Sequence, residues 1–84
     1  MNYKYNTRGT CAREIKFELE DGIVKNVSFY GGCNGNLKGI AALVEGKKAE
    51  EIIPLIKGLK CGFKSTSCPD QLALALEEAL NEQN

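Results

Sequence analysis

The clearest pattern in the chain is the strict alternation of apolar and charged residues from Glu14 to Glu20. This period of two is typical of a strand with one buried face and one solvated face. The dipeptide Asp21-Gly22 follows, and it tolerates the positive φ angles of a type I′ turn. Residues 23–30 again carry the composition of a strand, so the sequence predicts a β-hairpin.

Shorter patterns flank this hairpin. Tyr3–Thr7 alternates aromatic and polar residues, which indicates a short edge strand. After the hairpin the apolar residues recur at helical spacing in three segments. We expect the first helix to end at Gly46, the second to contain Ala49–Ile56 and end before Gly58, and the third to begin near Ser67.

Two prolines and a cap refine the helix boundaries. Ser67 and Asp70 have the S-x-x-D spacing of a capping box, and Pro69 suits a first helical turn. Pro54 lies inside the pattern of the second helix. We expect Pro54 to kink this helix or to shift its start toward Ile53.

Three strands followed by helices define an α+β fold. We expect a small three-stranded antiparallel sheet followed by two or three helices packed on one face, with residues 1–84 forming a single domain. The residues predicted to form the core share the inward faces of these elements: Ile15, Phe17, Leu19, Val27, Phe29, Leu37, Ile40, Leu72 and Leu76.

Composition narrows the range of functions. Eleven basic and eleven acidic residues cancel, and no basic run exists, so we expect no nucleic-acid partner. No stretch approaches the ~18 apolar residues of a membrane span, and the N-terminus has no apolar signal region, so we expect a cytoplasmic protein without a membrane partner. A chain of 84 residues is too small for a large catalytic barrel, and we do not expect it to be an enzyme by itself.

The cysteines carry the candidate chemistry. Cys33, Cys61 and Cys68 lie in segments rich in glycine or polar residues, and Cys11 opens a strand. The sequence has no histidine, so a transition-metal site would be built mainly from these thiols, which suit zinc or an iron–sulfur cluster. The start of a helix also stabilises a thiolate at Cys68. We expect the four cysteines to converge at one end of the sheet.

Residues 66–70 read TSCPD, and together with the GGC at 31–33 and with Cys61 they resemble the TSCPD domain family. This resemblance implies a small domain that occurs alone in bacteria or as a tail on adenosylcobalamin-dependent ribonucleotide reductases. It also suggests a ribonucleotide reductase or another redox protein as a partner. The chain lacks the barrel that ribonucleotide reduction requires.

A more distant resemblance is to iron–sulfur cluster scaffold proteins of the IscU/NifU type. Cys11, the segment Tyr30–Cys33 and Cys68 follow the order of the scaffold cysteines around a hairpin and before a last helix. Arg13 stands where the scaffolds carry an acidic residue that eases cluster release. The resemblance therefore implies an IscU/NifU-like fold more than the donation of a cluster.

Three interpretations follow. In the first, Cys33, Cys61 and Cys68, with Cys11 as a fourth ligand, bind zinc or an iron–sulfur cluster. In the second, Cys61 and Cys68 cycle between dithiol and disulfide for a partner reductase. In the third, the cysteines pack as small apolar residues, and the domain is a non-catalytic regulatory or interaction accessory of a ribonucleotide reductase.

Overall fold

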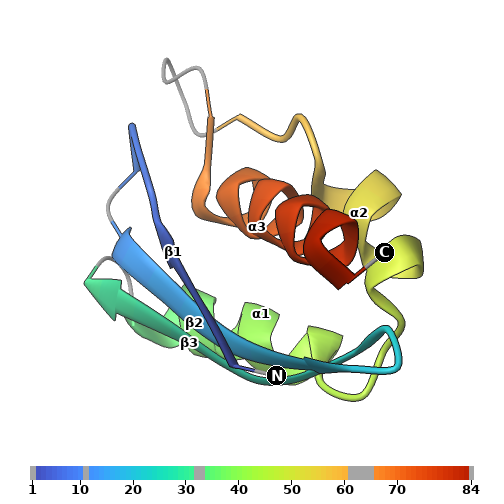
Figure 1. Ribbon diagram of the computed structural model, residues 1–84. Helices are drawn as coiled ribbons and strands as arrows, with labels where there is room; N and C mark the ends of the chain where they lie inside the picture. Colours follow the sequence, from blue (N-terminus) through green and yellow to red (C-terminus); the bar gives the residue numbers. More distant parts are fainter. Residues whose placement is uncertain (1, 11, 32–33, 61–65, 84) are drawn as a thin grey trace.

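The chain forms a three-stranded sheet followed by three helices (Figure 1). The computed structural model describes residues 2–10, 12–31, 34–60 and 66–83. The elements are β1 (Asn2–Asn6), β2 (Ala12–Glu20), β3 (Ile23–Gly31), α1 (Asn34–Val44), α2 (Ala49–Ile56) and α3 (Cys68–Gln83). This arrangement confirms the predicted α+β fold class. Within the described ranges, no helix is both long enough and apolar enough to cross a membrane.

The sheet is antiparallel and has the strand order β1-β2-β3. The predicted hairpin is present, with a turn in which Asp21 has a φ of 51° and Gly22 a φ of 79°. Positive φ at both central positions defines the type I′ turn, whose twist matches that of the flanking strands. β1 lies at the edge of the sheet, as the short alternating segment predicted.

A bulge in β3 shifts the alternation of its side chains. The register of β2 and β3 is irregular between Lys16 and Glu18, and opposite this point Asn26 has a positive φ of 52°. An extra residue in one strand reverses the side-chain parity beyond it. Val24 and Val27 therefore both contribute to the core, although they are three positions apart.

The three helices cover one face of the sheet. The opposite face carries exposed polar and aromatic side chains: the Lys4 ammonium lies 3.3 Å from a Glu14 carboxylate oxygen, and the Lys16 ammonium lies 5.1 Å from the centre of the exposed Tyr30 ring. The inner face instead packs against the helices. Figure 1 shows α3 crossing over the sheet and α1 running beside β3.

The core lies between this inner face and the helices. Six of the nine predicted core residues are buried: Ile15, Phe17, Leu19, Leu37, Leu72 and Leu76. The other three are half-buried and pack against the core cluster: Val27, Phe29 and Ile40. The core also contains buried residues outside the predicted core set: Val24, Val44, Ala49, Ile52, Ala75 and Ala79.

Of the two effects predicted for Pro54, a kink or a shift of the helix start toward Ile53, the shift is wrong. α2 begins at Ala49, and Pro54 lies inside it. The N–H of Ala49 donates a 2.8 Å hydrogen bond to the carbonyl of Gly22 in the hairpin turn, and Lys48 forms a β-bridge with Ile23. These contacts with the hairpin satisfy a free N–H of the first helical turn and fix the start of the helix.

The buried position of Leu76 gives the fold a direct test. Its side chain is 0% exposed at the centre of α3, so Leu76→Ala should lower the free energy of unfolding by about 2–5 kcal/mol in denaturant titration. Glu78→Ala, on the exposed side of the same helix, is the matched control and should change it by less than about 0.5 kcal/mol. A loss below about 1 kcal/mol for Leu76→Ala would contradict the packing of α3 on the sheet.

Candidate functional site

The N-terminus of α3 is capped by Ser67. The hydroxyl of Ser67 accepts a 3.2 Å hydrogen bond from the N–H of Asp70, and its carbonyl accepts a 2.9 Å bond from the N–H of Gln71. The same hydroxyl donates a 2.7 Å bond to the carbonyl of Leu59. Ser67 is thus the predicted N-cap, and it also binds the segment that follows α2 to the start of α3.

Asp70 fills a different role from the one that a capping box implies. One of its carboxylate oxygens accepts a 2.6 Å hydrogen bond from the N–H of Gly58, and the other accepts a bond from the hydroxyl of Thr66. The bonds from Thr66 and Gly58, with help from the positive charge of Lys57, lower the pKa of the Asp70 carboxyl even though burial opposes this. Asp70 therefore fixes the end of α2 against the first turn of α3.

Gln71 extends this network to the strands. Its amide nitrogen donates a 3.0 Å bond to the hydroxyl of Thr66, and its amide oxygen accepts a 3.2 Å bond from the N–H of Arg8, in the turn between β1 and β2. Gly9, next to Arg8, has a φ of 70°, and a Cβ added there would lie 3.2 Å from the methyl group of Thr66. The turn thus packs tightly against the start of α3 and requires glycine for both reasons.

These side chains form a closed, satisfied set. Thr66, Ser67, Asp70 and Gln71 are all buried, and among the described residues no buried polar side-chain atom lacks a hydrogen-bond partner. Within the TSCPD segment, Thr66, Ser67 and Asp70 thus have structural roles. The sequence pattern identified Ser67 but not Thr66 or Gln71. The hydroxyl of Thr66 joins Asp70 and Gln71 within the same turn, which no capping pattern predicts, and the other partner of Gln71, Arg8, lies far away along the chain.

Cys68 is the only predicted metal ligand among the described residues. It is the first residue of α3, it is half-buried, and its thiol is free. Its backbone is held on both sides by the capped turn. The residue therefore lies at the positive end of a 16-residue helix.

The other three predicted ligands, Cys11, Cys33 and Cys61, lie outside the described residues. Within the described part of the chain, no group of three histidine, cysteine, aspartate or glutamate residues is placed to hold a metal ion. The predicted metal site at Cys11, Cys33, Cys61 and Cys68 therefore stays a prediction.

Described neighbours of the four cysteines nevertheless meet at one end of the molecule. Ala12, which follows Cys11, pairs with Gly31, which is two residues before Cys33. Leu59, two residues before Cys61, accepts the hydrogen bond from Ser67, which precedes Cys68. The contacts of Arg8 and Gly9 with α3 connect these two pairs of segments.

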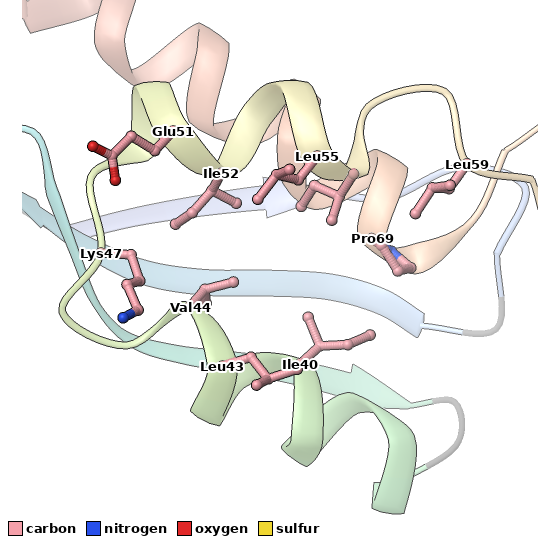
Figure 2. A pocket seen from close by; sticks show the side chains of 10 residues that line it. Ile40, Leu43, Val44, Lys47, Glu51, Ile52, Leu55, Leu59 and Pro69 are labelled. Atoms are coloured by element: carbon pink, nitrogen blue, oxygen red, sulfur yellow. The ribbon is translucent and has the colours of Figure 1, made fainter.

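A second feature is an open apolar groove between α1 and α2, which we name the leucine groove (Figure 2). Its volume is about 390 Å³, and it is lined by Ile40, Leu43, Val44, Lys47, Glu51, Ile52, Leu55, Ile56, Leu59 and Pro69. Leu59 and Pro69 lie at one end, and Lys47 and Glu51 lie at the other. Leu43, Leu55 and Leu59 are exposed. The sequence patterns did not reveal this groove, because its two walls come from separate helices.

Comparison with known proteins assigns the family. Residues 1–80 match the model of the TSCPD domain, and the chain belongs to this family. The match confirms the resemblance drawn from the TSCPD and GGC segments. No curated protein and no solved structure gives a match, and the likeness to iron–sulfur scaffolds stays a prediction.

The lowered pKa of Asp70 makes stability depend on pH. Because the folded pKa is below the unfolded value of about 3.9, the unfolded state binds more protons in this range, and stability falls as the pH drops through it. Asp70→Asn should cost about 1–3 kcal/mol at neutral pH, and this difference from wild type should shrink below about pH 4. Urea titrations at several pH values measure the difference.

The matched control is Asp21→Asn, which removes an exposed carboxylate from the hairpin turn. This substitution should change the unfolding free energy by no more than about 0.5 kcal/mol at neutral pH. A difference between wild type and Asp70→Asn that stays constant down to low pH would show that the charge of Asp70 does not stabilise the fold.

The cap has its own test. Ser67→Ala removes the acceptor for the N–H of Asp70 and the donor to Leu59, so the unfolding free energy should fall by about 1–2 kcal/mol. Ser67→Asp keeps an acceptor at the cap but cannot donate to Leu59. Its stability should therefore lie between those of Ser67→Ala and wild type, and equal stability of all three proteins would contradict the cap.

Proposed function

We propose that this TSCPD domain is a thiolate metal-binding module, in which Cys33, Cys61 and Cys68, with Cys11 as a fourth ligand, hold zinc or an iron–sulfur cluster. The observation that supports the proposal is the pairing of described neighbours of the cysteines: Ala12 pairs with Gly31 in the sheet, and Leu59 is bonded to Ser67 at the start of α3. Soft thiolate donors without histidine suit these metals and disfavour Mg²⁺ and Ca²⁺.

The described contacts hold neighbours of the cysteines together in two pairs, Ala12 with Gly31 and Leu59 with Ser67. Gly31 and Leu59 each lie two residues before a cysteine, and two extended residues span at most about 7 Å. Ala12 and Ser67 are direct neighbours of Cys11 and Cys68. A shared metal requires each sulfur at about 2.3 Å from the ion, and this spacing is compatible with the paired positions of these neighbours.

The buried network supports a binding role in another way. Ligands must be presented by a rigid frame if metal binding is to avoid a large cost of ordering the chain. The hydrogen bonds of Thr66, Ser67, Asp70 and Gln71 supply such a frame around Cys68. These four residues stabilise the start of α3 through their hydrogen bonds. The thiol of Cys68 takes no part in these bonds, and we propose that it binds the metal.

The family membership suggests where such a module acts. TSCPD domains resemble the tail of adenosylcobalamin-dependent ribonucleotide reductases, so we propose a ribonucleotide reductase or another redox protein as the partner. In this role the domain is a cytoplasmic accessory and carries out no ribonucleotide reduction by itself.

Metal analysis tests the proposal. Protein purified anaerobically under reducing conditions should bind one zinc ion or one cluster per chain, measured by elemental analysis and by visible absorption. Cys33→Ser, Cys61→Ser and Cys68→Ser should each weaken binding by at least about 100-fold, more than is typical for loss of an outer-shell partner.

A matched control tests whether metal binding depends on the position of the thiol at residue 68 or only on the number of thiols in the chain. The double variant Cys68→Ser/Ser28→Cys restores four cysteines but puts one on the exposed strand β3. It should bind as poorly as Cys68→Ser alone. Wild type that binds neither metal, or single variants that bind as well as wild type, would leave the cysteines as redox or packing residues.

A further inference from the structure

The leucine groove carries three of the four large apolar side chains that are exposed among the described residues. Leu43 is 76% exposed, Leu55 is 75% exposed and Leu59 is 47% exposed. All three line the groove, so their exposed surface is contiguous. Contiguous apolar patches on a soluble domain mark interaction surfaces, whereas isolated exposed leucines do not.

The exposed leucines are not the residues that attach α1 and α2 to the core. The neighbouring residues Val44 and Ile52 are buried in the core and fix α1 and α2 in place. Figure 2 shows Leu43 on α1 and Leu55 on α2 on opposite sides of the same space. The groove is thus a preformed surface with a hollow between two protruding apolar side chains.

From this geometry we propose that the leucine groove is the interface of a symmetric homodimer, with a second copy of this chain as its occupant. A two-fold interface must be self-complementary, because the same patch meets itself. Here one patch supplies both the protruding leucines and the hollow that receives them. The formal net charge of zero also favours association, because copies of the chain do not repel one another.

The two opposite charges at one end of the groove also favour a second copy of the chain as the partner. Lys47 and Glu51 lie at this end (Figure 2), and among the described residues neither forms an ion pair within its own chain. In a two-fold arrangement whose axis runs along the groove, the α1 wall of one copy faces the α2 wall of the other and like ends stay together. Lys47 of one copy then faces Glu51 of the other, and the reverse contact follows by symmetry. A strongly basic or acidic partner would satisfy only one of these two charges.

The first experiment measures the oligomeric state by sedimentation equilibrium in reducing buffer with a chelator, so that neither a disulfide nor a shared metal can link two chains. Wild type should be a dimer in equilibrium with monomer. The double variant Leu43→Ser/Leu55→Ser should raise the dissociation constant by more than about 100-fold, because each dimer loses four buried leucine side chains.

Tyr30→Ser is the matched control. Tyr30 is 55% exposed but lies on the opposite face of the sheet, so its removal should leave the dissociation constant unchanged within about threefold. Circular dichroism of each variant checks that the fold is kept.

A charge exchange tests the orientation of the two copies. Lys47→Glu and Glu51→Lys should each weaken the dimer, because like charges then face one another across the interface. An equimolar mixture of these two variants should regain a dimer, in which each chain's altered residue faces an opposite charge. The double variant Lys47→Glu/Glu51→Lys should also dimerise.

Three results would overturn the proposal. The first is wild type that stays monomeric at the highest concentration it reaches. The second is a dimer that Leu43→Ser/Leu55→Ser leaves as tight as wild type. The third is a mixture of the two charge variants that remains monomeric. Each result is obtained without bound metal, so it is independent of the outcome for the proposed thiolate site.

Discussion

The arrangement of the helices depends on the hydrogen bonds that the buried carboxylate of Asp70 accepts. This carboxylate accepts hydrogen bonds from Gly58, after α2, and from Thr66, before α3. A buried carboxylate is costly unless such bonds satisfy it. Since both donors must be present for Asp70 to be buried, this side chain fixes the end of one helix relative to the start of the next.

The same end of the molecule connects the helices to the sheet. Gln71 accepts a hydrogen bond from the N–H of Arg8, and Ser67 donates one to the carbonyl of Leu59. The first turn of α3 therefore contacts both the turn between β1 and β2 and the segment that follows α2. A site that includes Cys68 is therefore built beside this hydrogen-bonded network. Rigid support of this kind is what a multidentate ligand set requires.

The one-sided sheet sets a different constraint. With polar and charged side chains on the outer face, all the apolar surface of the strands must be covered by three short helices. The inward sides of α1 and α2 bury Val44 and Ile52 for this purpose. Leu43 and Leu55 lie near them on the same helices but line the groove and are exposed. Their exposure creates the surface proposed to bind a second copy.

Local interactions alone determined much of this fold. The alternation in β2, the Asp21-Gly22 turn and the cap at Ser67 depend on residues no more than a few positions apart, so their chemistry is readable from the sequence. The α+β class and six core residues follow from the same patterns. The TSCPD segment also identified the family from the sequence.

Only the tertiary structure decided the remaining features. The bulge at Asn26 brings Val24 inward, and the contact of Ala49 with Gly22 fixes the start of α2 in spite of Pro54. The bond from Gly58 to Asp70 joins residues 12 positions apart, and the walls of the leucine groove come from different helices. Such contacts depend on how the elements pack, and no pattern within a single element records the position of its neighbour.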